Sequence, residues 1–241
     1  MKTLNDIVKG IDIIYYINVD THHERRKKME MLFQDMSTKC IRINAVNGTT
    51  QQDFILNKID KCGNLISILE YACMLSHLET IKLIAEDSTI ETALIFEDDV
   101  SLDFQIYWKY SLDEIMANAP VDWEIIQLNY SMRPNRDVPE DLYTRNLTWS
   151  NGHSDYFCAQ AYIIKKSACK KVIDTLYVTD KYVLPENKTH HADQLLFSIL
   201  TTYVYKYPYF TFTYDNQSTL HPLHTLNHIK SRLKIDHMYK I

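Results

Sequence analysis

The chain has 241 residues, of which 46% are hydrophobic and 24% are charged, and its formal net charge is −5. These proportions indicate a globular chain with a sizeable core and argue against a disordered or low-complexity protein. The acidic balance also disfavours a protein that coats nucleic acid, because such proteins are normally basic. We therefore expect one domain over residues 1–241, with a C-terminal tail from about residue 220.

Neither a membrane span nor a signal peptide is predicted. The longest apolar runs fall far short of the ~20 residues that cross a bilayer, and polar residues interrupt the N-terminal segment. We expect a cytoplasmic protein. The five cysteines include no CxxC pair, so free buried thiols are expected in place of a zinc ribbon or a disulfide framework: Cys40, Cys62, Cys73, Cys158 and Cys169.

Strand-like and helix-like segments alternate along the chain. Runs rich in β-branched and aromatic residues predict strands at residues 11–18, 40–45, 92–96, 123–128, 157–165 and 203–212. Helical spacing of apolar residues predicts helices at residues 29–36, 65–85, 104–119, 167–177 and 193–200. This order indicates an α/β fold with a largely parallel central sheet.

Three further segments have a distinct character. Residues 131–152 show no sustained period and hold two prolines, so a long surface loop is expected there. The tyrosine-rich stretch 203–214 contains Pro208, which favours an edge strand, and its exposed tyrosines would favour a homodimer. The tail after residue 220 is expected to be partly helical.

An acidic triplet, Glu97-Asp98-Asp99, directly follows the apolar strand at residues 92–96. Neighbouring carboxylates repel one another, so something positive should compensate them. Strand alternation would place Glu97 and Asp99 on one side, where two oxygen donors suit Mn²⁺ or Mg²⁺ with phosphate completing the shell. A solvated acidic turn that caps the next helix is the alternative, and a receiver-like phosphoacceptor pocket is another.

A polar segment, Ile17-Asn18-Val19-Asp20, ends the first predicted strand and is followed by Arg25 and Arg26. Polar groups at a strand end can hold a base and ribose, and the arginines could pair with phosphate or a carboxylate. Composition alone favours solvated helix charges over ligands for Arg25 and Arg26. With only four glycines in the chain, neither a GxGxxG nor a P-loop is present. A bridging metal would serve the same electrostatic purpose as a glycine-rich cradle.

Ordered short blocks from about residue 13 to 219 resemble glycosyltransferase family 25. The blocks are Ile17–Asp20 with Glu24-Arg25-Arg26, Arg42–Gly48, Glu70–His77, Leu94–Val100, Ala161–Ile164, Asp193 and Gln217-Ser218. The chain departs from the family at Thr21-His22-His23, which replaces a basic pair and proline, and at Ala72, where glycine is common. The family includes lipooligosaccharide and procollagen galactosyltransferases and is compatible with a bacterial, animal or viral source.

The resemblance implies a GT-A-like single domain with a Rossmann-like, largely parallel central sheet flanked by helices. Such a domain would transfer a hexose, galactose or glucose, from a UDP-sugar with inversion. The acceptor would be a hydroxyl of a glycan or of a collagen-like hydroxylysine, and Mn²⁺ or Mg²⁺ would be the cofactor. Glu97 and Asp99 are the predicted metal ligands, with His221 as a further one. The predicted nucleotide contacts are Ile17, Asn18, Asp20, Arg25, Ala45, Ser76, His77 and Asp98.

The acceptor hydroxyl needs a general base, for which Asp193 is the first choice and Asp155 the alternative. Asp193 could equally be a helix cap, and His77 could bond within the core. Three functions stay open: an active sugar transferase, a degenerate member that binds nucleotide-sugar or glycan without turnover, and a different metal-dependent phosphoryl or nucleotidyl transferase. The Thr21-His22-His23 segment favours the second, whereas the intact acidic triplet argues against it.

Overall fold

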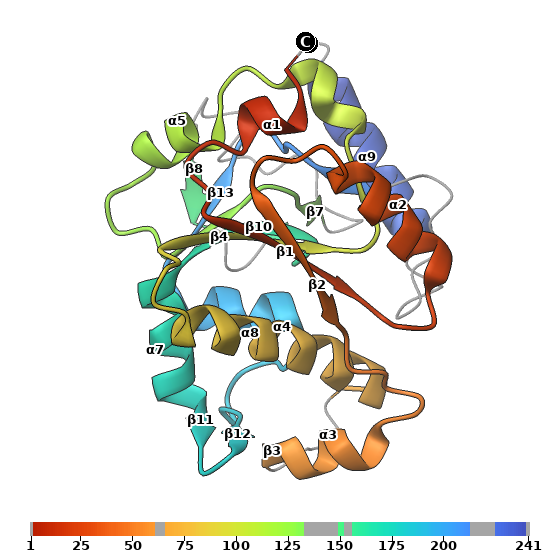
Figure 1. Ribbon diagram of the computed structural model, residues 1–241, viewed down its shortest axis with the longest axis vertical. Coiled ribbons are helices and arrows are strands. Elements are labelled where there is room, and N and C mark those ends of the chain that lie inside the picture. The colour runs from red at the N-terminus through yellow and green to blue at the C-terminus, as the bar shows by residue number, and fades with distance from the viewer. Residues whose placement is uncertain (1, 61–65, 133–148, 152–155, 213–224, 240–241) are drawn as a thin grey trace.

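The computed structural model describes residues 2–60, 66–132, 149–151, 156–212 and 225–239 (Figure 1). A seven-stranded sheet forms the middle layer, in the order β2-β1-β4-β10-β6-β13-β8. These strands span Lys39–Asn44, Ile13–Asn18, Thr92–Glu97, Ala161–Lys165, Ile125–Gln127, Thr202–Tyr205 and Trp149–Asn151, respectively.

Five of these strands share one direction. β1 is parallel to both β2 and β4, and β13 is parallel to β6. Only β10 and β8 run the other way: β10 is antiparallel to both β4 and β6, and β8 is antiparallel to β13. The predicted α/β fold with a largely parallel central sheet is therefore confirmed.

Helices cover both faces of this sheet (Figure 1). One face carries α4 (Ile68–Glu86), α7 (Lys166–Leu176) and α8 (Ala192–Ile199). The other carries α1 (Leu4–Ile7), α2 (His23–Phe33), α5 (Leu112–Ala117) and α9 (Thr225–Tyr239). No helix among the described residues combines the length and the apolar character that crossing a membrane requires.

Alternation along β1 divides its side chains between two cores. Ile13, Tyr15 and Ile17 pack in the core under α4, whereas Ile14 and Tyr16 pack in the core on the α2 side. All six residues of β1 are buried. A strand buried on both faces needs an uninterrupted apolar run, which is what the sequence of β1 provides up to Asn18.

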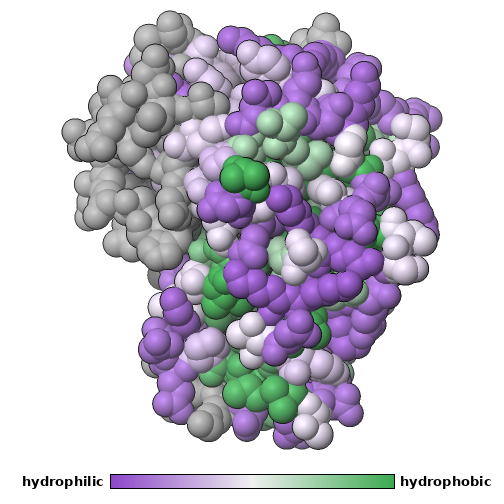
Figure 2. Space-filling view, turned by 90° about the vertical axis from the view of Figure 1, so that its left-hand side faces the viewer, coloured by the Kyte–Doolittle hydropathy of each residue, from purple (hydrophilic) through white to green (hydrophobic). Residues whose placement is uncertain are grey.

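Smaller elements surround the main sheet. A three-stranded sheet joins β11 (Tyr177–Val178), β12 (Lys181–Val183) and β3 (Ile59–Asp60) beside α3 (Gln52–Lys58). Figure 2 shows a face that is largely hydrophilic, with hydrophobic residues gathered toward its lower part. The remaining pairs are β5 (Val100–Ser101) with β14 (Thr211–Phe212) and β7 (Ser131–Met132) with β9 (Tyr156–Phe157).

The single helix predicted over residues 104–119 is wrong. The chain forms a 3₁₀ helix at Asp103–Tyr107 and then α5, with a break between them. A capping box starts α5, because the Ser111 hydroxyl and the Glu114 carboxylate bond each other's backbone N–H. This Ser-x-x-Glu signal was present in the sequence and marks a new helix start.

The edge strand predicted over residues 203–212 is also wrong. β13 lies between β6 and β8 and ends at Tyr205, so Pro208 lies after the strand. Tyr205, Tyr209 and Phe210 are buried in the core on the α2 side. An exposed tyrosine edge was the basis for predicting a homodimer. In this stretch Tyr207 is exposed and Tyr203 is half-buried, and the homodimer itself stays a prediction.

The loop predicted at residues 131–152 contains β7 at its start and β8 at its end, and residues 133–148 lie outside the described residues. The C-terminal segment is helical over α9, as expected. Cys40, Cys73, Cys158 and Cys169 are free thiols, of which only Cys169 is fully buried, and Cys62 lies outside the described residues.

Candidate active site

A cavity of about 280 Å³ lies where β1 and β4 end and the first half of α4 passes. In open α/β sheets, ligands bind in such crevices beyond the carboxyl ends of parallel strands. The cavity brings together most of the residues that the sequence singled out: Ile17, Arg25, Ala45, Ser76, His77, Glu97, Asp98 and Asp99. It is also lined by Thr21, His22 and Cys73.

Asp98 is buried and both of its oxygens have partners. Arg25 Nη1 donates to Asp98 Oδ1 at 2.9 Å, and Asn18 Nδ2 donates to Asp98 Oδ2 at 2.6 Å. Asn18 is fixed in turn, because its own oxygen accepts from Arg42 Nε at 2.9 Å. The middle acid of the triplet therefore anchors the acidic turn to β1 and α2.

Asp20 does not line the cavity. Its exposed carboxylate accepts from Arg42 Nη2 at 2.8 Å. The predicted contact of Asp20 with a nucleotide thus lies outside the enclosed part of the site.

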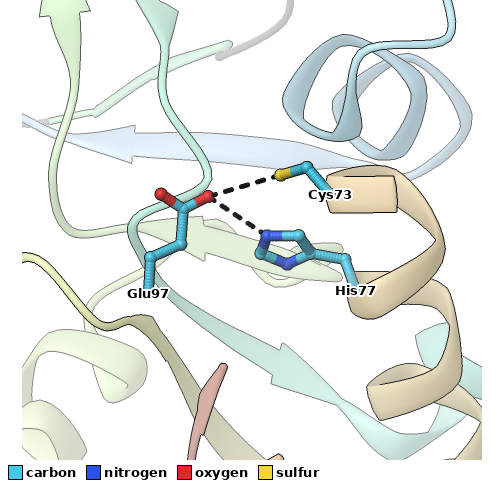
Figure 3. Close-up of side chains that lie close together, drawn as sticks. All are labelled: Cys73, His77 and Glu97. Atoms are coloured by element: carbon cyan, nitrogen blue, oxygen red, sulfur yellow. Dashed lines mark hydrogen bonds and ion pairs between the residues drawn. The ribbon is translucent and has the colours of Figure 1, made fainter. Parts of the chain in front are cut away.

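The side chains of Glu97 and Asp99 make different contacts from that of Asp98. Glu97 Oε1 lies 3.2 Å from His77 Nε2 and 3.9 Å from Cys73 Sγ (Figure 3). Asp99 Oδ1 accepts from Gln160 Nε2 at 2.6 Å. Burial and then the nearby charge of Glu97 raise the pKa of Asp99 to about 6.

This donor set fits a hard divalent cation. Two carboxylates at one cavity wall supply the oxygen ligands that Mn²⁺ and Mg²⁺ prefer. The raised pKa of Asp99 reflects a negative charge that burial and Glu97 disfavour, and a cation would relieve this cost. The chemistry of the site is therefore compatible with the predicted cofactor.

His77 belongs to both the core and the cavity. It is buried, and its Nδ1 lies 3.0 Å from the Tyr162 hydroxyl while its Nε2 faces Glu97. Tyr162 itself is fully buried. His77 therefore bonds within the core and also lines the cavity, and its contact with a nucleotide stays a prediction.

Ser76 joins two elements behind the cavity wall. Its hydroxyl donates to the Ala72 carbonyl at 2.7 Å and accepts from the Val46 N–H at 2.9 Å. The Ala45 N–H donates to the Asn18 carbonyl at 3.0 Å. These bonds fix the segment after β2 against α4 and β1, so the backbone on this side of the cavity is held in place.

A row of buried amides supports Asp99 and was missed by the sequence reasoning. Asn129 Nδ2 donates to Gln160 Oε1, and Gln160 then donates to Asp99. The Oδ1 atom of Asn129 and the Oε1 atom of Gln127 are buried without a partner among the described residues. Gln127 and Asn129 at the end of an apolar strand were the signal that could have revealed this row.

Asp193 lies at the start of α8, close to the acidic cluster. Asp193 Oδ2 accepts from the Cys158 N–H and Oδ1 accepts from the Gln194 N–H, both at 2.7 Å. Burial first, and then the charges of Glu97, Asp99 and Asp193, raise the pKa of the Cys158 thiol. The three carboxylates therefore lie within electrostatic reach of one thiol, although Asp193 does not line the cavity itself.

Cys158 adopts a positive φ of 100°, which is unusual for a residue other than glycine and costs backbone energy. This conformation accompanies the N–H bond to Asp193. The other two predicted residues, Asp155 and His221, lie outside the described residues.

The acids lie at the carboxyl end of a largely parallel α/β sheet, which is where ligands bind in open sheets of this kind. The sequence profile of glycosyltransferase family 25, described as an LPS biosynthesis protein family, matches residues 11–188. The chain therefore belongs to glycosyltransferase family 25.

Curated relatives support this assignment. The chain is 26% identical over 182 residues to human procollagen galactosyltransferase 2, covering 68% of this chain and 28% of the relative. It is 26% identical over 147 residues to procollagen galactosyltransferase 1 of Danio rerio, and the match covers 54% of this chain and 24% of that relative. The chain thus spans about a quarter of the length of the curated relatives it matches.

A solved structure of the galactosyltransferase LgtC, in complex with donor and acceptor sugar analogs, is similar to this chain. The similarity covers 66% of this chain and 59% of the LgtC chain. The sequence identity is 14% and the TM-score is 0.34.

Proposed function

We propose that this protein is a metal-dependent, inverting hexosyltransferase that uses a UDP-sugar. The carrying observation is the acidic turn after β4: Arg25 and Asn18 satisfy Asp98, while Glu97 and Asp99 remain at the cavity wall. The names of the curated relatives favour galactose as the sugar, with glucose as the close alternative. The acceptor is a hydroxyl of a glycan or of a hydroxylysine in a collagen-like protein.

The donor would lie in the cavity with its diphosphate toward Glu97 and Asp99. Ile17 and Ala45 offer an apolar wall for the base. Asn18 and Asp20 do not line the cavity, and their contact with the ribose remains part of the proposal. Mn²⁺ or Mg²⁺ held by Glu97 and Asp99 would supply neutralisation of the charge that develops on the diphosphate. Gln160 keeps the Asp99 carboxylate in position.

Inversion requires a base on the side opposite to the leaving group, and Asp193 is our choice. The acceptor oxygen attacks the anomeric carbon, its proton passes to the Asp193 carboxylate, and the bond from the anomeric carbon to the diphosphate oxygen breaks. Two backbone N–H groups hold Asp193 in a fixed place. Asp155, three residues before Cys158 in the sequence, is the alternative base.

Ligand-dependent melting tests the binding part of this proposal. UDP and Mn²⁺ together, at 100 times the dissociation constant, should stabilise the protein by about 2.7 kcal/mol. For a chain of this length, that corresponds to a rise in Tm of roughly 5–10 °C. Asp99→Asn should abolish the part that depends on Mn²⁺, whereas Asp53→Asn, on the exposed surface of α3, should keep it.

A hydrolysis screen across UDP-sugars tests turnover. Release of UDP from one hexose donor, lost in Asp99→Asn, supports the transferase. Binding without hydrolysis or transfer would favour the degenerate alternative, in which Thr21-His22-His23 alters the donor contacts. His22 is placed to do so, because it lines the cavity and its Nδ1 lies 3.9 Å from Asp98 Oδ2. No Tm shift with any UDP-sugar would contradict both.

A further inference from the structure

A second set of possible metal ligands lies next to the acidic turn. Cys73, His77 and Glu97 each offer one ligand atom, and these atoms all lie within 4.8 Å of one another. Figure 3 shows Cys73 and His77 projecting from α4 toward Glu97 at the end of β4. Residues four apart on a helix share one face, so α4 presents the thiol and the imidazole together.

We propose that Cys73 Sγ, His77 Nε2 and Glu97 Oε1 form a zinc site. This site goes beyond the proposed function, because a zinc ion needs neither a sugar donor nor an acceptor to bind there. It also differs from the Glu97–Asp99 pair in chemistry. Thiolate and imidazole ligands favour Zn²⁺, whereas Mn²⁺ and Mg²⁺ prefer oxygen ligands alone.

Two of the three separations between the ligand atoms already approach those of a tetrahedral zinc shell, and the third lies within 4.8 Å. Zinc bonds of about 2.0–2.3 Å set tetrahedral ligand-to-ligand separations of roughly 3.3–3.6 Å. The separations here are 3.2 Å from Glu97 Oε1 to His77 Nε2 and 3.9 Å from Glu97 Oε1 to Cys73 Sγ. Shifts of a few tenths of an ångström would bring these two pairs to zinc geometry.

Tyr162 supplies the outer partner that a zinc-bound histidine needs. Its hydroxyl lies 3.0 Å from His77 Nδ1 and can either donate or accept. Without metal, the Tyr162 hydroxyl donates to Nδ1 and the Nε2–H donates to Glu97. With zinc, Nδ1–H donates to Tyr162 and Nε2 is free to bind the ion. Binding also displaces the Cys73 thiol proton to solvent, which leaves the thiolate on zinc.

All three ligands line the cavity, so an ion can reach them from solvent and the fourth position is open to water. Because Glu97 belongs to both sets, zinc here would engage one of the two carboxylates proposed to hold the donor's cation. The site would thus link the proposed metal chemistry to zinc availability.

Cobalt substitution tests the site in the metal-stripped full chain, kept reduced by a phosphine. Thiolate-bound tetrahedral Co²⁺ should give a sulfur-to-cobalt charge-transfer band that Zn²⁺ removes by competition. Cys73→Ser should lose this band, whereas Cys40→Ser, on β2, should keep it. Tyr162→Phe should keep the band and weaken zinc binding by about 10–100-fold, the usual cost of losing an outer partner.

No band in the wild-type protein, or an equal band in Cys73→Ser, would overturn the proposal. If Cys73→Ser does not fold by circular dichroism, His77→Gln provides the second variant, and an unchanged cobalt spectrum there would also contradict the site. Unchanged zinc affinity in Tyr162→Phe would overturn the orienting role assigned to its hydroxyl.

Discussion

Arg25 Nη1 lies 2.9 Å from Asp98 Oδ1 and thereby ties α2 to the acidic turn after β4. The Asp98 side chain is 8% exposed and that of Arg25 is 19% exposed, so this ion pair is largely shielded from water. It neutralises the middle acid of the triplet. Glu97 and Asp99, on either side of it, line the cavity and are the proposed ligands of a cation.

Arg25→Met should destabilise the protein by about 3 kcal/mol, because it leaves a buried carboxylate without its cation. Adding Asp98→Asn should recover part of this loss. Urea denaturation measures the free energy of unfolding. Arg26→Met is the matched control: the Arg26–Glu30 pair is exposed, so its loss should cost at most about 1 kcal/mol. Equal effects at both arginines would contradict the shielded pair.

Gln160→Leu should weaken Mn²⁺ binding by about 10–100-fold, because Asp99 loses the amide that positions it. Titration of free Mn²⁺ by electron paramagnetic resonance measures this affinity. Gln105→Leu is the control, since the Gln105 amide bonds the Lys2 carbonyl away from the cavity. Unaltered Mn²⁺ affinity in a folded Gln160→Leu protein would show that Asp99 does not need this support.

Asp99 should make the metal-free protein less stable as the pH rises. Its pKa is raised from 3.8 in a free side chain to about 6, by burial and then by Glu97. The Asp99 carboxyl therefore keeps its proton to a higher pH in the folded state than in the unfolded state. The stability that this neutral carboxyl contributes is fully present below about pH 4 and is lost as the pH rises through about 6.

Asp99→Asn should accordingly exceed the wild type in unfolding free energy by roughly 1–3 kcal/mol above pH 7, with the difference vanishing near pH 4. Urea titrations across this range, in a metal chelator, measure it. Asp53→Asn should show no such pH-dependent difference in unfolding free energy from the wild type. A wild-type protein that is as stable as Asp99→Asn at pH 8 would show that the charge of Asp99 is not disfavoured.

Gly48→Ala should disturb the wall between the β2–α3 segment and α4. A Cβ at Gly48 would lie 2.9 Å from the Leu69 Cα atom and 3.1 Å from the Ala72 Cβ atom. Because backbone must move, we expect a loss of about 1–3 kcal/mol in unfolding free energy. Thr50→Ala, at an exposed site nearby, should have little effect. A Gly48→Ala protein of wild-type stability would indicate that α4 shifts freely.

Long, strongly patterned elements could be predicted from the sequence. β1 and α4 were expected at residues 11–18 and 65–85 and occur at Ile13–Asn18 and Ile68–Glu86. β1 owes its structure to an apolar run that is buried on both faces, and α4 to apolar residues at helical spacing that are buried against the core. The direction of β10 could not be predicted, because the local pattern of a buried strand is the same in parallel and antiparallel pairing.

The cavity lining was partly predictable and its hydrogen bonds were not. Ile17, Glu97 and Asp99 follow from their places at strand ends, which a parallel sheet gathers at one edge. The Gln160 support of Asp99 joins residues 61 apart in sequence, so it depends on the pairing of β10 with β4. The catalytic and nucleotide-binding roles of these residues stay predictions.

The position of Mn²⁺ in a crystal grown with Mn²⁺ and UDP tests the central claim most directly. Anomalous scattering at the manganese edge should place one ion between Glu97, Asp99 and the UDP phosphates, with Asp98 still bonded to Arg25. UDP bound without an ion near these carboxylates, or a cavity that holds neither, would contradict a metal-dependent transferase.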